Sequence, residues 1–293
     1  MSLFVQQHHS YCDFSSNESW IILSAIEQSI KRKIEAVGTP LKDWDIKINY
    51  GIKTGFNDAF IISTAKREEI LSNCIDEDER ERTAAIIRPI LRGRDIKRYG
   101  YSWADLWLLW IPWHFPLHLD RSIEGASTKA EYLLKTMYPA VYQHLLQHKE
   151  ELSARNKAET GIRYEWYAMQ RWGANYWEDF NKPKIIYPET TQGAYFAYDS
   201  EGMYIDKTCF MMLTDHAEYL QATLSSALFE FAYKHIFSSI ELGSNGYQYN
   251  KHALIKLPIK KVEEIPALYT DEYFFNLYDL SKEEVDYILS CKN

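Results

Sequence analysis

Residues 51–60 read Gly-Ile-Lys-Thr-Gly-Phe-Asn-Asp-Ala-Phe, and residues 88–99 read Arg-Pro-Ile-Leu-Arg-Gly-Arg-Asp-Ile-Lys-Arg-Tyr. In the first segment, two glycines permit a tight turn whose backbone amides approach a partner closely. Lys53, Thr54 and Asn57 add side-chain donors suited to a phosphate or to a base edge. In the second segment, a proline and a glycine fix the backbone while long cationic side chains project from it. Both segments predict polar loops placed beside regular elements.

Two later parts of the sequence combine turn-forming and hydrogen-bonding residues in a similar way. Residues 171–173 read Arg-Trp-Gly and lead to residues 182–189, which read Lys-Pro-Lys-Ile-Ile-Tyr-Pro-Glu. Residues 243–250 read Gly-Ser-Asn-Gly-Tyr-Gln-Tyr-Asn and run into Leu-Pro-Ile at 257–259. Asn and Gln can pair bidentately with adenine, and Arg with guanine, so such loops suit sequence reading. The same residue types are equally common in ordinary turns.

Charge is distributed unevenly along the 293 residues, whose net charge is −8. Between Arg80 and Tyr99 seven bases stand against two acids, a balance of +5, whereas residues 262–293 hold eight acids and two bases, a balance of −6. A local basic patch matters more for a phosphate partner than the mean charge does. A solvated helix face is the ordinary alternative for the basic stretch. The sequence does not decide the role of this acidic end.

Helical and strand patterns follow one another irregularly. Ser15 and Glu18 form a capping-box pattern ahead of apolar residues at helical spacing, and Gly38 with Pro40 closes that helix. Residues 199–202 suit a hairpin turn, and 243–249 a polar loop. Further helices are expected over 76–91, 128–155 (interrupted by Pro139), 215–236 and from 281, and strands over 46–50, 59–62, 106–111, 184–187, 195–198, 203–213 and 253–259.

This irregular order favours an α+β fold, that is, a mixed α/β class with irregular mixed sheets and flanking helices, over a regular doubly wound sheet. We expect three parts along the chain. Residues 1–40 form a leader and a packing helix, residues 41–262 form the main domain, and residues 263–293 form an acidic helical tail.

Signatures of catalysis and of cofactor binding are scarce. The sequence has no glycine-rich phosphate loop after a strand, no Gly-x-Ser-x-Gly elbow, and no Asn/Asp-Pro-Pro-Tyr/Phe tetrapeptide of the kind amino-methyltransferases use. The histidine pairs 114/118 and 144/148 lack a third ligand at a telling spacing. We therefore expect no catalytic residue, no metal and no cofactor in this chain.

The cysteines and the apolar runs of the sequence indicate the compartment, and two alternative functions stay open. Four cysteines lie far apart without paired spacing, which favours a reducing compartment, and no apolar run approaches 18 residues, so we expect a cytoplasmic protein with no membrane partner. One alternative is a stand-alone metal-dependent nuclease that uses Asp58, Glu189 and Asp206. A second alternative is a protein-interaction scaffold without nucleic-acid function.

Taken in order, the four segments resemble the C-terminal specificity domain, or target recognition domain, of the Taq-type adenine-specific DNA methyltransferases and of type IIG restriction-modification enzymes. The similarity rests on residues 51–60, 89–99, 182–186 and 257–259, and covers roughly residues 40–262. The flanks, including the tail from Leu277, also resemble those of type IIG proteins. Leu224-Ser225-Ser226 departs from a Leu-Asn-Ser that is frequent in the family, at a position in a structural helix.

The resemblance implies a module that recognises a short site in double-stranded DNA. A methyltransferase or nuclease domain of the same protein, or of a partner subunit, would bind S-adenosylmethionine, with Mg as a further candidate. That catalytic domain is missing from this sequence, which leaves open a fragment or a natural stand-alone subunit. Base-reading residues differ between family members and cannot be carried over. The candidate DNA-binding residues are Lys53, Thr54, Asn57, Arg92, Arg94, Lys97, Arg98, Arg171, Trp172, Asn245, Gln248 and Tyr249.

Overall fold

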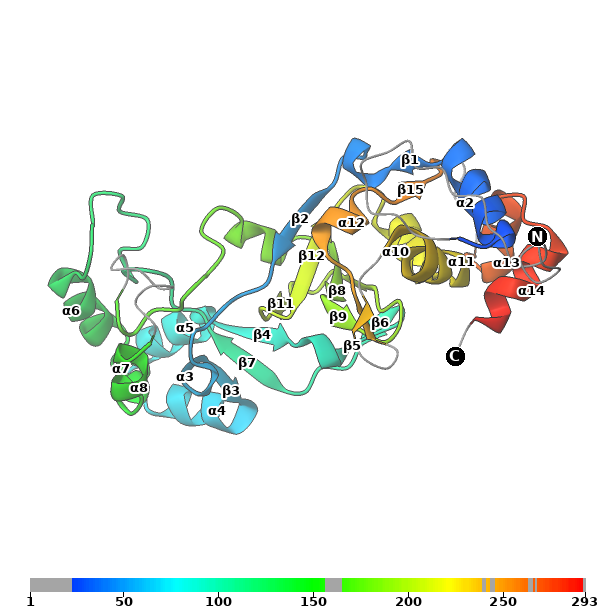
Figure 1. Cartoon of the computed structure of the whole chain (residues 1–293). Helices are drawn as coiled ribbons and strands as arrows, with labels where there is room; N and C mark the ends of the chain where they lie inside the picture. The colour runs from blue at the N-terminus through cyan, green and yellow to red at the C-terminus, as the bar shows by residue number, and fades with distance from the viewer. Residues whose placement is uncertain are drawn as a thin grey trace.

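A four-stranded antiparallel sheet occupies the middle of the molecule (Figure 1). In this computed structural model, the residues described are 23–155, 165–238, 241–242, 246–262, 266 and 268–291. The strand order is β10 (Ala197–Asp199), β8 (Lys184–Pro188), β12 (Cys209–Leu213) and β2 (Lys47–Tyr50). All residues of β8 are buried, as expected for a strand that is covered on both faces and reads as an apolar run.

The two faces of this central sheet pack into two different hydrophobic cores. Successive side chains of a strand point to opposite faces. Ile186 of β8 and its partner Met211 of β12 therefore belong to one core, whereas Tyr187 and its partner Phe210 belong to the other. Both cores depend on this one sheet for their shared wall.

The first core lies between the central sheet and the elements on the left of Figure 1. A second sheet there has the order β11–β4–β7–β3, in which β11 is parallel to β4 and the other pairs are antiparallel. Its strands and the helices of this part are β3 (Ile61–Ser63), β4 (Ile87–Leu91), β7 (Leu106–Leu109), β11 (Tyr204–Ile205), α3 (Asn57–Phe60), α4 (Thr64–Ser72), α5 (Glu77–Ile86), α6 (Thr128–Met137), α7 (Pro139–Leu146) and α8 (Lys149–Ser153).

The second core is mainly helical and lies on the right of Figure 1. Its helices are α2 (Ala25–Val37), α10 (Ala217–Ser225), α11 (Ala227–Ala232), α13 (Asp271–Leu277) and α14 (Lys282–Ser290). A π-helical turn, Tyr233–Phe237, extends α11. Among the described residues, no helix is both long and apolar enough to cross a membrane.

Smaller elements connect these layers. Three short pairings and several single turns complete the described chain: β1 (Thr39–Pro40) with β15 (Pro258–Ile259), β5 (Ile96–Lys97) with β6 (Gly100–Tyr101), β14 (Gly246–Gln248) between β9 (Thr190–Thr191) and β13 (Glu241–Leu242), α12 (Lys251–Leu254), and the 3-10 turns Leu41–Asp43, Gly93–Asp95 and Trp177–Asn181.

The α+β class with irregular mixed sheets is confirmed. The first described helix has a capping box formed by Ser24 and Glu27, and it ends at Gly38 as predicted. The capping box predicted at Ser15 and Glu18 lies outside the described residues.

Local predictions were wrong where a short polar cap or a proline interrupts a pattern. The helix expected over 76–91 ends at Ile86, because the apolar segment around Pro89 pairs with β7 as strand β4. The helix expected over 215–236 breaks at Ser226, whose hydroxyl caps α11 by accepting the Phe229 N–H. Residues 57–60 form a helical turn where the start of a strand was expected.

A strand, a hairpin and a loop that were expected after residue 198 also differ from the sequence prediction. Asn250 accepts the Ala253 N–H and caps α12, so that only Pro258–Ile259 of the strand expected over 253–259 is a strand. The predicted hairpin around 199–202 is absent, because β10 and β11 belong to different sheets. Part of the loop expected over 243–249 is strand β14, which pairs with β9.

A buried ion pair explains the turn after β10. Lys184 Nζ donates to Asp199 Oδ2 at 2.5 Å and to the Phe180 carbonyl at 2.6 Å, and both charged residues are fully buried. Asp199 also accepts the N–H groups of Glu201 and Met203, each at 3.0 Å. Burial lowers the pKa of Lys184, although Asp199 opposes this effect. The pair thus directs the chain out of one sheet and toward the other.

We predict that Lys184→Met lowers the free energy of unfolding by about 3–5 kcal/mol, because it leaves the Asp199 carboxylate buried without its counter-ion. Urea unfolding followed by circular dichroism measures the change. The matched control is Lys42→Met, at an exposed lysine, which should have little effect. The double variant Lys184→Met/Asp199→Asn should recover part of the loss. A loss no larger than that of the control contradicts this role for the ion pair.

Candidate nucleic-acid interface

A cleft of about 1060 Å³ opens beside the ends of β8 and β12, and we call it the β8–β12 cleft. It brings together residues from three of the four segments singled out in the sequence, namely 88–99, 182–189 and 243–250. The residues that line it are Arg92, Gly93, Arg94, Ile96, Lys97, Pro188, Glu189, Thr190, Thr191, Gln192, Tyr195, Asp206, Lys207, Thr208 and Gly246.

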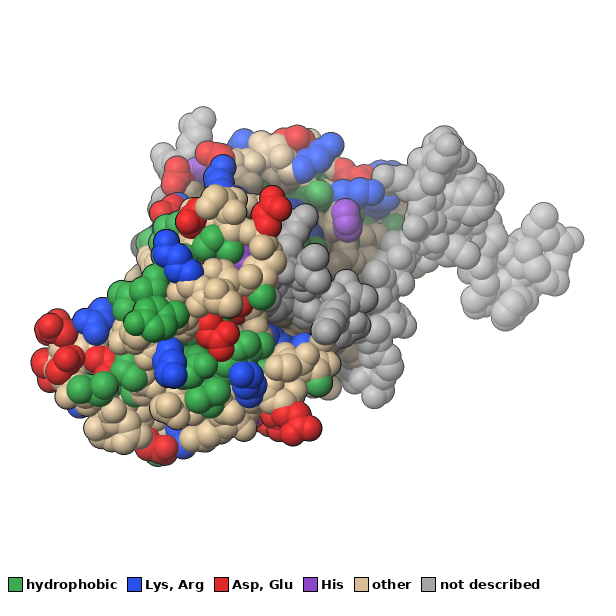
Figure 2. All heavy atoms as spheres, turned by 90° about the vertical axis from the view of Figure 1, so that its left-hand side faces the viewer, with side chains coloured by type: hydrophobic (Ala, Val, Ile, Leu, Met, Phe, Trp, Pro, Cys, Tyr) green, Lys and Arg blue, Asp and Glu red, His purple; other side chains and the backbone are tan. Residues whose placement is uncertain are grey.

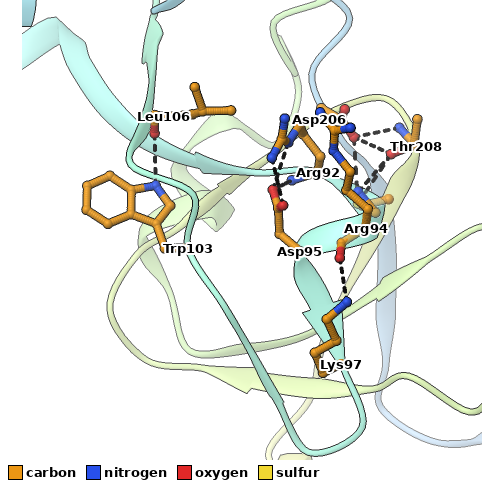
Figure 3. A network of polar contacts seen from close by, with 10 residues as sticks. Arg92, Arg94, Asp95, Lys97, Trp103, Leu106, Asp206 and Thr208 are labelled. Carbon is orange, nitrogen blue, oxygen red and sulfur yellow. Dashed lines mark hydrogen bonds and ion pairs between the residues drawn. The ribbon is translucent and has the colours of Figure 1, made fainter. Parts of the chain in front are cut away.

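Arg92 holds the shape of one wall of this cleft (Figure 3). Its guanidinium donates twice to the Asp95 carboxylate, from Nε to Oδ2 and from Nη2 to Oδ1, each at 2.9 Å. The Arg92 N–H also donates to Asp95 Oδ2 at 2.9 Å, which closes the 3-10 turn between them. Burial would raise the pKa of Asp95, but the bonds from Arg92 outweigh it and hold that pKa below its ordinary value near 3.8.

Three exposed cations surround the cleft: Arg94, Lys97 and Lys207. Lys97 Nζ donates to the Arg94 carbonyl at 2.8 Å, which orders the loop while its charge stays at the surface. Lys207 lies in the turn before β12, where Asp206 accepts both the N–H and the hydroxyl of Thr208. Thr208 Oγ1 in turn accepts the Gly93 N–H at 3.0 Å, so the two basic loops are joined.

Arg98 is tied to the helical core and does not line the cleft. Its Nε donates to the Ser225 carbonyl at 2.8 Å, and its Nη2 forms an ion pair with Glu230 at 2.8 Å. These contacts attach the basic segment to the junction between α10 and α11. The geometry therefore gives Arg98, like Arg92, a positioning role in the protein.

The cleft also contains polar side chains that sequence analysis did not select. Thr190 and Gln192 are exposed and follow β8 directly, in and after strand β9. Gln248, a predicted DNA-binding residue, is half-buried and pairs through β14 with Thr190. The sequence signal for Gln192 was its position just beyond the Lys-Pro-Lys-Ile segment, where the chain leaves a buried strand.

The first segment lies apart from the lining of the cleft. Lys53 and Arg171 are joined to each other through an antiparallel backbone bridge. Thr54 is buried and its hydroxyl donates to Asn57 Oδ1 at 2.6 Å. Gly51 is required for close approach, since a Cβ there would lie 1.9 Å from the Asp206 carbonyl oxygen. Gly51 thus lets this segment pass close to the turn that contains Lys207.

Two other predicted residues are buried. Trp172 packs against Trp110 in the first core, and Tyr249 packs against Phe196 and Tyr233 in the second. Their burial gives them packing roles. Asn245 lies outside the described residues.

The carboxylates considered for a nuclease are not assembled as a metal site in the described part of the chain. Glu189 and Asp206 line the cleft, but Asp58 does not. No group of three or more His, Cys, Asp or Glu side chains suited to a metal ion occurs among the described residues.

The face of the molecule seen in Figure 2, which is turned toward the left of Figure 1, has a different character. Basic and acidic side chains are interspersed there with apolar ones, and neither charge forms a large continuous area.

Comparison with known proteins identifies the class. Residues 88–259, more than half of the chain, match the family described as the TaqI-like C-terminal specificity domain, and the chain belongs to this family. The resemblance inferred from the sequence motifs is confirmed. The matched range includes every residue that lines the cleft.

Two solved structures are similar to this chain. The type IIL restriction-modification enzyme MmeI, in complex with DNA, is 15% identical with a TM-score of 0.45, over 75% of this chain and 25% of that chain. The type IIG restriction endonuclease BpuSI is 13% identical with a TM-score of 0.49, over 90% of this chain and 28% of that chain. This chain thus spans about a quarter of the length of each of these enzymes.

We predict that the Arg92–Asp95 pair makes stability depend on pH in the acid range. The folded pKa of Asp95 lies below its ordinary value near 3.8. The stabilisation is therefore complete above that value and is lost as pH falls through the folded pKa. Asp95→Asn should make the free energy of unfolding fall less steeply with acid than in the wild type, as measured by urea unfolding between about pH 2 and pH 6.

The control for this experiment is Asp45→Asn, at an exposed carboxylate outside the cleft. It should leave the pH dependence close to that of the wild type. Identical pH profiles for Asp95→Asn and the wild type would contradict the coupling.

Proposed function

We propose that this chain reads a short site in double-stranded DNA as the target recognition module of a restriction-modification enzyme. The observation that carries the proposal is the β8–β12 cleft, in which exposed cations surround polar side chains fixed at the ends of paired strands. Membership in a family of specificity domains supports it.

Two kinds of contact contribute to protein–DNA recognition. Contacts to phosphates set affinity and register, and contacts to base edges set specificity. We assign the phosphate contacts to Arg94, Lys97 and Lys207, because their side chains are exposed around the cleft. Arg92 and Arg98 hold the loop through Asp95 and Glu230, so they preserve the geometry in which those contacts are made.

Base contacts are assigned to two polar side chains that line the cleft, Thr190 and Gln192, and to Gln248, which pairs with Thr190. Gln192 and Gln248 carry carboxamides, which suit the N6 and N7 atoms of adenine, and Thr190 can bond to several bases. Thr190 and Gln248 are partners in the β9–β14 pairing, and Gln192 follows β9 directly. Lys53, Asn57 and Arg171 remain further candidates for contacts outside the cleft.

A catalytic domain of the same protein, or of a partner subunit, completes this proposal. That domain would bind S-adenosylmethionine, and Mg where DNA is also cut, and would methylate adenine at the site chosen by this module. With the catalytic domain on the other side of the duplex, this chain alone would bind DNA weakly, near the nonspecific range of about 10⁻⁴–10⁻⁶ M. The cytoplasm is the expected location of such an enzyme.

We predict that Arg94→Ala/Lys97→Ala weakens binding to all duplexes alike and flattens the salt dependence. Each lost phosphate contact reduces the slope of log K against log salt by about 0.9, so the pair should reduce it by about 1.8. Fluorescence anisotropy with a labelled duplex at several salt concentrations measures this slope.

The charge-matched control is Lys135→Ala/Lys282→Ala, which removes two exposed cations from α6 and α14 at opposite ends of the molecule (Figure 1). This control should reduce the slope by clearly less. Equal slopes for the two double variants would contradict the assignment of phosphate contacts to the cleft.

We also predict that Gln192→Ala relaxes specificity at one base pair of the site while leaving the salt slope unchanged. Loss of one base contact costs about 1–3 kcal/mol at that position. Competition between duplexes that differ at single positions measures the effect. Gln143→Ala, at an exposed glutamine of α7, is the control. A uniform loss at all positions would assign Gln192 to the phosphates instead.

A further inference from the structure

Glu189 and Asp206 are acidic side chains among the cations that line the cleft. Glu189 follows β8 directly and lines the cleft together with Arg94, Lys97 and Lys207. Its backbone is fixed from both sides, because its N–H donates to the Thr208 carbonyl at 2.8 Å and its carbonyl accepts the Tyr249 N–H at 2.9 Å. The backbone from which its side chain projects is therefore held on both sides.

The carboxylates of the cleft region differ in what they bind. Asp95 is paired with Arg92, and Asp206 accepts the N–H and the hydroxyl of Thr208. The carboxylate of Glu189 is half-buried and makes no hydrogen bond or ion pair with any residue in the part of the chain that the structure describes. Asp95 and Asp206 thus have structural partners, whereas Glu189 presents its acceptors to the cleft.

A free carboxylate opposes the binding of a polyanion unless it meets a hydrogen-bond donor. In the major groove, the amino groups of cytosine and adenine are the donors that bases offer. Adenine places the acceptor N7 beside its amino group, and guanine and thymine present acceptors, which repel a carboxylate. Cytosine N4 is therefore the base group that suits Glu189.

We infer that Glu189 determines specificity by accepting a hydrogen bond from the N4 amino group of a cytosine in the recognised site. This inference rests on the proposed function and names one base that the module reads. It also explains how an acid is tolerated among the cations, since the same carboxylate penalises sequences that place another base there.

The test is selection of bound duplexes from a randomised pool by the chain as it stands, at low and moderate salt, followed by sequencing. The wild type should enrich a motif with one C·G pair that Glu189→Gln no longer requires, with the other positions unchanged. The loss of discrimination at that pair should be about tenfold or more. Glu189→Gln should also bind random duplex more tightly, because a charge that repels phosphates has been removed.

A second measurement replaces the selected cytosine by 2-pyrimidinone, which lacks the 4-amino group. The wild type should bind the substituted duplex about tenfold more weakly. Glu189→Gln should lose clearly less affinity, because its uncharged amide oxygen is a weaker acceptor than the carboxylate. Glu189→Asp, which keeps the carboxylate, should retain a preference for cytosine. Glu151→Gln, at an exposed glutamate of α8, is the matched control and should behave as the wild type does.

The outcomes separate the two proposals. A wild-type motif that Glu189→Gln reproduces in full overturns the inference and leaves the proposed function standing, even where affinity for random duplex rises. Absence of both salt-dependent binding and an enriched motif for the wild type overturns the proposed function, and the inference with it.

Discussion

Burial of β8 on both faces constrains the rest of this molecule. One face of the strand packs into the first core and the other into the helical core, and β10 and β12 pair with its two edges. A strand held in this way cannot shift its register by one residue without exchanging the side chains of the two cores. The residues that leave its end, Glu189 to Gln192, therefore start from a backbone that is fixed by the packing of the whole chain.

The elements around the cleft are attached to this strand through backbone contacts. The turn before β12 lies against Gly51, which carries no side chain that would push it away, and its Thr208 bonds to Gly93 of the basic loop. The Tyr249 N–H bonds to the Glu189 carbonyl from the other side. Side chains in the cleft can consequently differ without disturbing the scaffold, because the contacts that hold it are made by the backbone.

The larger features of the fold followed from the sequence because they depend on apolar runs and on paired turn residues. The run before Glu189 predicted a strand, and the basic segment 88–99 predicted cations that project from a turn. Other features depend on contacts between distant residues and could not be predicted. No local pattern links Lys184 to the bend after Asp199, and none shows that Tyr249 is buried among other aromatic rings.

The same limit applies to the charges of the site. Arg92, Arg94 and Arg98 are the same residue type within seven positions, so the sequence analysis assigned the same DNA-binding role to all three. In the structure, Asp95 and Glu230 pair with Arg92 and Arg98, so in the proposed function the attraction for a duplex is assigned to the other, exposed cations. The basic stretch, with its balance of +5, thus contains two kinds of cation. Arg92 and Arg98 hold the loop in place, whereas Arg94 and Lys97 are exposed to solvent. A net charge of −8 is therefore compatible with the proposed phosphate contacts, because the field that a phosphate meets depends on nearby exposed charges and the more distant ones are screened.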